Sequence, residues 1–377
     1  MLHRRTISAF VLATIVAVLA LQSATAQSRD RVYYRDPGKE GKPTLVEGDT
    51  KESGAGVEVI DGIKKTKISA ADMVRIDYGE LAGIDRGSLV ETDKDPAKNA
   101  FEFGKSLKSA TTAPEKAKRY LSYREAYWLA RAAGLKSGDE FVTAGKAAAD
   151  KLAAFTKAYP RSWESWHTAR EAARLYLQVG DSAAAVETVK LLAANTDLPA
   201  DLQVDAWLLR AGYLFRMGDT KGASDAIAEA ARNPKLEDLL PQKDRIAIFT
   251  EALKPKLPPP APVKMKDESD DDYTARVAKL VGDAKAEAIV AIPKVEAAIA
   301  RAKDPVSRAI GYNLLGDLNM LHGLTRDAMW AYLWVDTVYS QDKDEQIMAV
   351  TRLIDVFKIL KDEERTTQFE DRLQKLR

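Results

Sequence analysis

The amino-acid sequence predicts an α+β multidomain protein in which a mostly α-helical repeat solenoid follows a small all-β barrel. Three observations predict this fold class. Short segments of alternating apolar and polar residues fill positions 27–80, as in half-buried strands. From position 99 onward the apolar period lengthens to that of a helix and alanine becomes abundant. Glycine-centred turns then recur at a nearly constant spacing, which is typical of helical repeats.

Residues 1–26 have the three parts of a secretory signal peptide. Arg4 and Arg5 form a basic start, residues 7–21 are mostly apolar, and residues 24–26 are small enough for cleavage after Ala26. The alternative is a retained anchor, but a helix of this length would rise only about 22 Å, less than the roughly 30 Å hydrocarbon core. We therefore expect an exported protein, periplasmic or secreted, with no transmembrane segment after cleavage.

Composition excludes several functional classes. After cleavage the chain would carry 55 basic and 56 acidic side chains, and this balance argues against a nucleic-acid or polybasic membrane-binding role. The sequence contains no cysteine, which excludes thiol catalysis, haem attachment through cysteine and cysteine-ligated metal sites. We expect no cofactor and no metal, and a core held by burial alone.

Residues 27–80 are expected to form five short strands. Asp61-Gly62 is a strong two-residue hairpin signal, and residues 69–72 suit a single helical turn before the last strand. Closing such a meander into a barrel would remove its exposed edges. The expected strands are 31–35, 44–48, 57–60, 64–68 and 74–78.

The pattern from Gly56-Val57 through Ile68 to Asp72-Met73 resembles the N-terminal Sm-like β modules of exported bacterial repeat proteins. This resemblance covers roughly 50 residues. It implies a small barrel attached to a helical array.

The rest of the chain divides into segments of different composition and periodicity. Residues 81–98 are rich in glycine and charge and are expected to be a linker. Residues 99–253 form a first helical block, and residues 254–272 form a proline-rich and then acidic linker. Residues 273–377 form the second helical block.

Both helical blocks contain an internal repeat. Each turn needs a small residue in the left-handed conformation, and a second small residue five positions later lets the paired helices approach closely. An aromatic residue before the turn fills the space against the next pair. The expected repeat positions are Gly180, Ala185, Trp207, Gly218, Ala223, Tyr312, Gly316, Gly323 and Ala328. Lys361-Asp362 is expected to be a final turn without glycine.

These positions resemble the tetratricopeptide pattern of an aromatic residue, then Leu-Gly, then a small residue after the turn. Tyr312, Leu315-Gly316 and Ala328 fit it, whereas Trp207 is followed by Arg210-Ala211 where Leu-Gly is expected. The resemblance implies four to five helix pairs and a concave groove that binds a peptide or protein partner.

Trp330, Trp334 and Asn319 are the candidate partner-binding residues. The two tryptophans are four positions apart and displaced from the inward stripe of their helix. The first expectation is that they are buried and join one helix pair to the next. The alternative that the displacement allows is exposure, as a platform for a sugar ring or peptide side chain. A groove lined by Asn, Arg and Lys would favour a peptide.

No catalytic site is evident in the sequence. Two histidines remain after cleavage, His167 and His322, and neither has converging partners, so ordinary surface or helix-end roles are expected. The leading hypothesis is therefore an exported, non-enzymatic interaction scaffold for a protein or peptide partner. The alternatives are a carbohydrate or cell-envelope-polymer binding protein and, more weakly, a hydrolase. Buried titratable residues with shifted proton affinities would favour the hydrolase.

Overall fold

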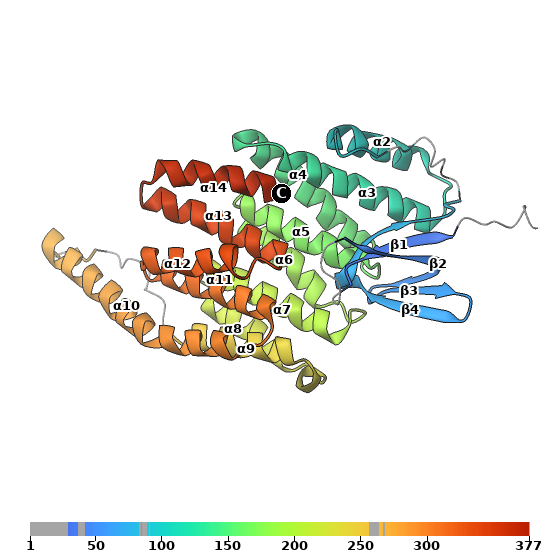
Figure 1. The fold of residues 1–377 in the computed structure, drawn as a ribbon. Helices are drawn as coiled ribbons and strands as arrows, with labels where there is room; N and C mark the ends of the chain where they lie inside the picture. Colours follow the sequence, from blue (N-terminus) through green and yellow to red (C-terminus); the bar gives the residue numbers. More distant parts are fainter. Residues whose placement is uncertain are drawn as a thin grey trace, which may run out of the picture.

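A computed structural model describes most of the chain (Figure 1). The signal-peptide prediction lies outside the described residues, as does most of the proline-rich segment. No helix in the described part is both long and apolar enough to cross a membrane. The described residues are 29–36, 42–82, 84, 89, 91–255, 264–266 and 268–376.

The N-terminal module contains the five expected strands in one antiparallel sheet, with a single 3-10 turn, η1 (Ala70–Asp72), before the last strand. Gly62, in the turn between β3 and β4, has a φ of +59°, which glycine adopts without strain. The strands are β1 (Asp30–Tyr34), β2 (Thr44–Ser53), β3 (Gly56–Asp61), β4 (Lys64–Ser69) and β5 (Met73–Asp77).

The sheet is open, so the expected closure into a barrel is not observed. Its strand order is β4-β3-β2-β1-β5, which leaves β4 and β5 as the two edges. The physical reason is that helices complete its core. Val32, Val57 and Met73 are buried in one cluster with Trp163 and Trp166 of the helical part, so the sheet does not need to cover its own apolar face.

Thirteen α-helices make up most of the described chain. Consecutive helices pack as antiparallel neighbours in adjacent pairs, as a helical repeat requires. The helices are α2 (Pro96–Ser109), α3 (Glu115–Gly134), α4 (Gly138–Ala158), α5 (Glu164–Gln178), α6 (Ser182–Ala193), α7 (Ala200–Arg216), α8 (Thr220–Ala231), α9 (Leu240–Ala252), α10 (Asp270–Arg301), α11 (Pro305–Leu321), α12 (Thr325–Thr337), α13 (Lys343–Ile359) and α14 (Glu363–Leu376).

The predicted turn residues lie between paired helices. Gly180, Gly218 and Gly323 have φ angles of +83°, +80° and +68° at the turns that follow α5, α7 and α11. Lys361, between α13 and α14, has a φ of +57° and is the only non-glycine residue with positive φ in the described chain. The same local geometry is therefore built at all four turns, with glycine at three of them.

The predicted small residues lie where helices approach each other. Ala185, Ala223 and Ala328 are completely buried one turn into the second helix of each pair. A Cβ on Gly316 would overlap the ring of Tyr332, so only glycine allows α11 and α12 to pack this closely. Trp207 and Tyr312 are partly buried against the main core.

α9 and the helices from α10 onward belong to one packed array. One hydrophobic core joins residues of α9, such as Ile248, to residues of α10, such as Ile299. The acidic residues Asp270–Asp272, expected in a linker, instead form the first turn of α10. Ser269 caps this helix, since its hydroxyl accepts the backbone N–H of Asp272 at 3.0 Å, and acidic residues are favourable at a helix N-terminus.

The array curls so that its late helices return to its early ones. α13 lies beside α5 at its N-terminal end, where Arg170 and Asp344 form an ion pair of 2.7 Å. The sheet lies at one end of the array, next to α3, α5 and α6, while α10 runs along the opposite side (Figure 1). The concave side of the array is thereby enclosed between α5, α13 and the N-terminal module.

Candidate functional site

Two adjacent cavities occupy the concave side of the array. The first has a volume of about 330 Å³ and the second about 390 Å³. Arg35, Ala71, Arg170 and Asp342 line both of them. The N-terminal module contributes Arg35 and the η1 turn, so the site requires both parts of the protein.

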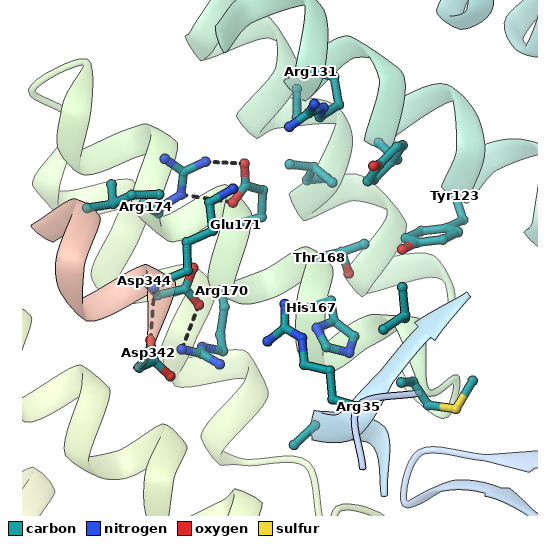
Figure 2. A pocket seen from close by; sticks show the side chains of 18 residues that line it. Arg35, Tyr123, Arg131, His167, Thr168, Arg170, Glu171, Arg174, Asp342 and Asp344 are labelled. Carbon is teal, nitrogen blue, oxygen red and sulfur yellow. Dashed lines mark hydrogen bonds and ion pairs between the residues drawn. The ribbon is translucent and has the colours of Figure 1, made fainter. Parts of the chain in front are cut away.

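The first cavity lies between α3, α5, the start of α13 and the N-terminal module (Figure 2). In this view Arg35 extends beside His167, and Arg131 lies at the far end. The cavity carries more positive than negative side chains, because five cationic residues face three acidic ones. The cationic residues are Arg35, Arg131, Arg170, Arg174 and Lys343, and the acidic ones are Glu171, Asp342 and Asp344.

Two of these arginines already have acidic partners. Arg170 pairs with Asp344, and Arg174 Nε donates to Glu171 at 2.8 Å. Asp342 caps α13, since its carboxylate accepts the backbone N–H groups of Asp344 and Glu345 at 2.9 and 3.0 Å. These contacts hold the polar wall of the first cavity in a fixed arrangement.

The second cavity differs from the first in its charge, because its principal charged side chains form ion pairs with each other. Arg216 pairs with Asp317 at 2.7 Å, and Arg245 pairs with Asp205 at 2.6 Å. The hydroxyl of Tyr332 also donates to Asp317 at 2.8 Å. These pairs link α7, α9 and α11 across the inner face and are structural.

Glu345 lies at the wall of the second cavity. Asn313 Nδ2 donates to its Oε2 at 2.8 Å and to its backbone oxygen at 3.1 Å. Burial raises the pKa of Glu345 to about 7, and the neighbouring Asp342 adds to the rise. Glu345 can therefore hold or release a proton near neutral pH. Its contacts with Asn313 join α13 to α11.

His167 connects the helical array to the N-terminal module. Its Nε2 lies 2.6 Å from the backbone oxygen of Ala70. Burial, with a smaller effect of the nearby Arg170, lowers the pKa of His167 to about 4, so the ring is neutral at pH 7 and Nε2 donates to the carbonyl. His167 lies in the first turn of α5 and is partly buried, and from there it joins two parts of the fold.

A second polar contact fixes the module from its other side. Arg119 on α3 pairs with Glu52 on β2, donates to the Tyr78 hydroxyl at 3.0 Å and lies 3.4 Å from Glu164. Burial raises the pKa of Glu164 to about 7, although Arg119 opposes this. Together with His167, this network orients Arg35 toward the cavities by fixing the module that carries it.

The predicted tryptophans lie on a different surface from the cavities. The side chains of Trp330 and Trp334 on α12 are 61 % and 46 % exposed. Trp334 stacks on Tyr312, with ring centroids 5.9 Å apart and an interplanar angle of 15°, and Tyr312 stacks on Tyr339 at 5.5 Å and 17°. We call Tyr312, Trp330, Trp334 and Tyr339 the aromatic platform.

Asn319 does not join this platform. It is only 2 % exposed on α11, so a partner cannot reach it in this conformation. His322 is also buried, at the end of α11, where its Nδ1 lies 2.9 Å from the backbone oxygen of Leu318.

Sequence reasoning missed the charged residues of the first cavity. Arg170 and Arg174 are four positions apart on α5, and this spacing could have placed two cations on one helix face. No sequence pattern indicated that Arg35 and Lys343 belong to one site. They lie near opposite ends of the chain, and only the curvature of the array brings both of them to the first cavity.

Comparisons with known proteins identify no relative for this chain. No protein-family profile matches it, and no curated protein matches it significantly.

Proposed function

We propose that this protein is an exported, non-enzymatic interaction scaffold of the tetratricopeptide-like type, which binds a segment of a protein partner on its concave side. The observation that carries the proposal is the pair of adjacent cavities between the helical array and the N-terminal module. Helical repeats commonly use their concave face for binding. Here that face is lined by fixed charged groups, which provide specificity for a polar segment.

Export is proposed from the signal pattern of residues 1–26, which predicts a mature N-terminus at Gln27. Sequencing the N-terminus of the protein recovered from the envelope and medium fractions tests this. Recovery from the cytoplasm alone would contradict export, whereas a first residue of Met1 in the envelope fraction would contradict cleavage and indicate a retained anchor.

Site-specific photocrosslinking in cells tests the scaffold role. A photoreactive phenylalanine analogue at Val74, which lines the first cavity, is expected to capture a partner that mass spectrometry can identify. The matched control is the same analogue at Phe101, which is exposed on α2 away from both cavities. Capture from position 101 with none from position 74 would overturn the proposed binding face.

A second candidate function is binding of a carbohydrate or envelope polymer, and the aromatic platform favours it. Trp330 and Trp334 are exposed, and the stacking of Trp334 on Tyr312 holds a flat ring at the surface that suits the apolar face of a sugar. The test is pull-down with insoluble envelope polysaccharide. Replacing Trp330 and Trp334 together by alanine is expected to abolish retention, while replacing exposed Phe101 by alanine leaves it unchanged. If the wild type, the double tryptophan variant and the Phe101 variant are retained equally, the aromatic platform is not the binding site.

A further inference from the structure

Two cationic side chains of the first cavity, Arg35 and Lys343, have no direct hydrogen bond or ion pair among the residues that the structure describes. Within the described residues, the side chain of Arg35 has neither a hydrogen bond nor an ion pair, although its backbone N–H is fixed by the oxygen of Asp72 at 2.8 Å. Lys343, the first residue of α13, likewise has no ion pair within the described chain. The Arg35 guanidinium acts on the carboxylates of Asp72 and Asp344 without a direct contact. It opposes the rise that burial causes in the pKa of Asp72, and it helps to lower the pKa of Asp344 against the effect of burial. Its N–H donors are therefore left to bind an anion.

The charges around Lys343 oppose its own protonation. Burial lowers the pKa of Lys343, and the guanidinium groups of Arg131 and Arg174 lower it further. Glu171 and Asp344 counteract this only in part. An anion in the cavity would favour the charged form of Lys343 and offset these unfavourable interactions.

We infer that the first cavity binds a carboxylate group of the partner segment, with Arg35 and Lys343 as its ligands from opposite sides. This inference rests on the proposed scaffold function and names the chemistry that the cavity recognises. Arg35 belongs to the N-terminal module and Lys343 to α13, so the carboxylate bridges the two parts of the protein.

A carboxylate is the anion that a peptide segment itself supplies, through Asp, Glu or its C-terminus, so it follows from the proposed scaffold function. The cavity has an excess of positive side chains over Glu171, Asp342 and Asp344, which favours an anion of this kind. The planar guanidinium of Arg35 can donate two parallel hydrogen bonds to a carboxylate. A volume of about 330 Å³ admits one or two side chains of a peptide and not a folded domain.

Fluorescence-anisotropy titration of the full mature chain tests the inference. The probe is a labelled pentapeptide of alanine and glutamate with a free carboxyl terminus, and its counterpart has glutamine for glutamate and an amidated terminus. We expect the acidic peptide to bind and the neutral one not to bind. Affinity should fall by about tenfold for Arg35→Gln or Lys343→Gln alone, and further for the double variant.

The matched control is the double variant Lys105→Gln/Lys108→Gln, which removes the same charge from the exposed face of α2. It should bind the acidic peptide as the wild type does. Circular dichroism and thermal unfolding confirm that each variant is folded. Equal binding of acidic and neutral peptides, unchanged affinity of the Arg35/Lys343 double variant, or no binding of the acidic peptide at millimolar concentration would each overturn the inference.

Inorganic phosphate separates the two sources of negative charge. We expect it to compete with the acidic peptide only through general ionic strength, as an equal ionic strength of sodium chloride does. Competition by phosphate well beyond that of sodium chloride would overturn the assignment to a carboxylate.

The photocrosslinking experiment distinguishes failure of this inference from failure of the scaffold proposal. If the partner captured from position 74 is retained in the Arg35/Lys343 double variant, the scaffold proposal stands and the carboxylate inference falls. If the wild type captures no partner, the scaffold proposal falls, and the carboxylate inference falls with it.

Discussion

Arg170 on α5 and Asp344 on α13 form an ion pair across the concave side of the molecule, with 2.7 Å between Nη2 and Oδ2. The two residues belong to helices far apart in the sequence, so this contact exists only because the array curls back on itself. It encloses the cavities and places Lys343, the neighbour of Asp344, opposite the N-terminal module.

Breaking this pair should loosen the closure of the array. Arg170→Gln or Asp344→Asn is expected to lower the free energy of unfolding by about 1 kcal/mol, because both side chains are only partly exposed. The double variant should cost little more than either single variant, and urea unfolding of all four proteins measures this coupling. The control cycle removes the exposed pair Lys190–Glu187 on α6, where almost no coupling is expected. If the losses of stability of the two single variants simply add in the double variant, the prediction that Arg170 and Asp344 stabilise the fold through their ion pair is wrong.

Gly316→Ala should disrupt the packing of α11 against α12. The added methyl group would overlap the buried ring of Tyr332, whose hydroxyl is held by Asp317, so the ring cannot move freely. We expect a loss of about 1–3 kcal/mol in the free energy of unfolding. Gly282→Ala on α10 is the control, since nothing surrounds that position and alanine favours a helix. The prediction is wrong if both variants gain stability in urea unfolding.

Lys361→Gly should stabilise the protein. Lys361 has a φ of +57°, which costs a non-glycine residue roughly 1 kcal/mol. The greater freedom of glycine in the unfolded chain offsets part of this, so we expect a gain of about 0.5 kcal/mol. Lys279→Gly, at an exposed helical position on α10, should instead cost about 1 kcal/mol. Thermal unfolding checks both, and a loss at position 361 equal to that at 279 would contradict the prediction.

Glu345→Gln should change how stability depends on pH. The pKa of Glu345 is raised to about 7 in the folded protein, so the stability from its protonated form is complete below about pH 4 and is lost as the pH rises through 7. Glutamine is neutral at every pH and can still accept from Asn313. The variant should therefore match the wild type near pH 4 and exceed its free energy of unfolding above pH 7, by up to about 3 kcal/mol. Denaturant unfolding at several pH values measures the difference.

The control for this effect is Glu296→Gln on α10. This variant makes the same chemical change at a position that is exposed in the folded protein. A pH-independent difference for Glu345→Gln would show that the carboxyl group of Glu345 titrates alike in the folded and unfolded chain.

Local patterns allowed much of the architecture to be predicted. The strands, the single 3-10 turn and the turns at Gly180, Gly218 and Gly323 follow from short-range rules of alternation and backbone conformation. Trp330 and Trp334 are exposed, which is the less expected of the two outcomes that their displacement from the inward stripe left open. Asn319 is buried instead of accessible, because its neighbours on α11 pack on both sides of that helix.

The sequence by itself determined the order of the elements, the change from strands to helices and the positions of the turns, since these depend on residues within a few positions of each other. Only the tertiary structure decided that the sheet stays open and that Arg35 and Lys343 face one cavity. Whether a sheet closes depends on what covers its apolar face, here Trp163 and Trp166. Which charged residues meet depends on the curvature that accumulates over many helix contacts, and no local pattern in the sequence encodes that curvature.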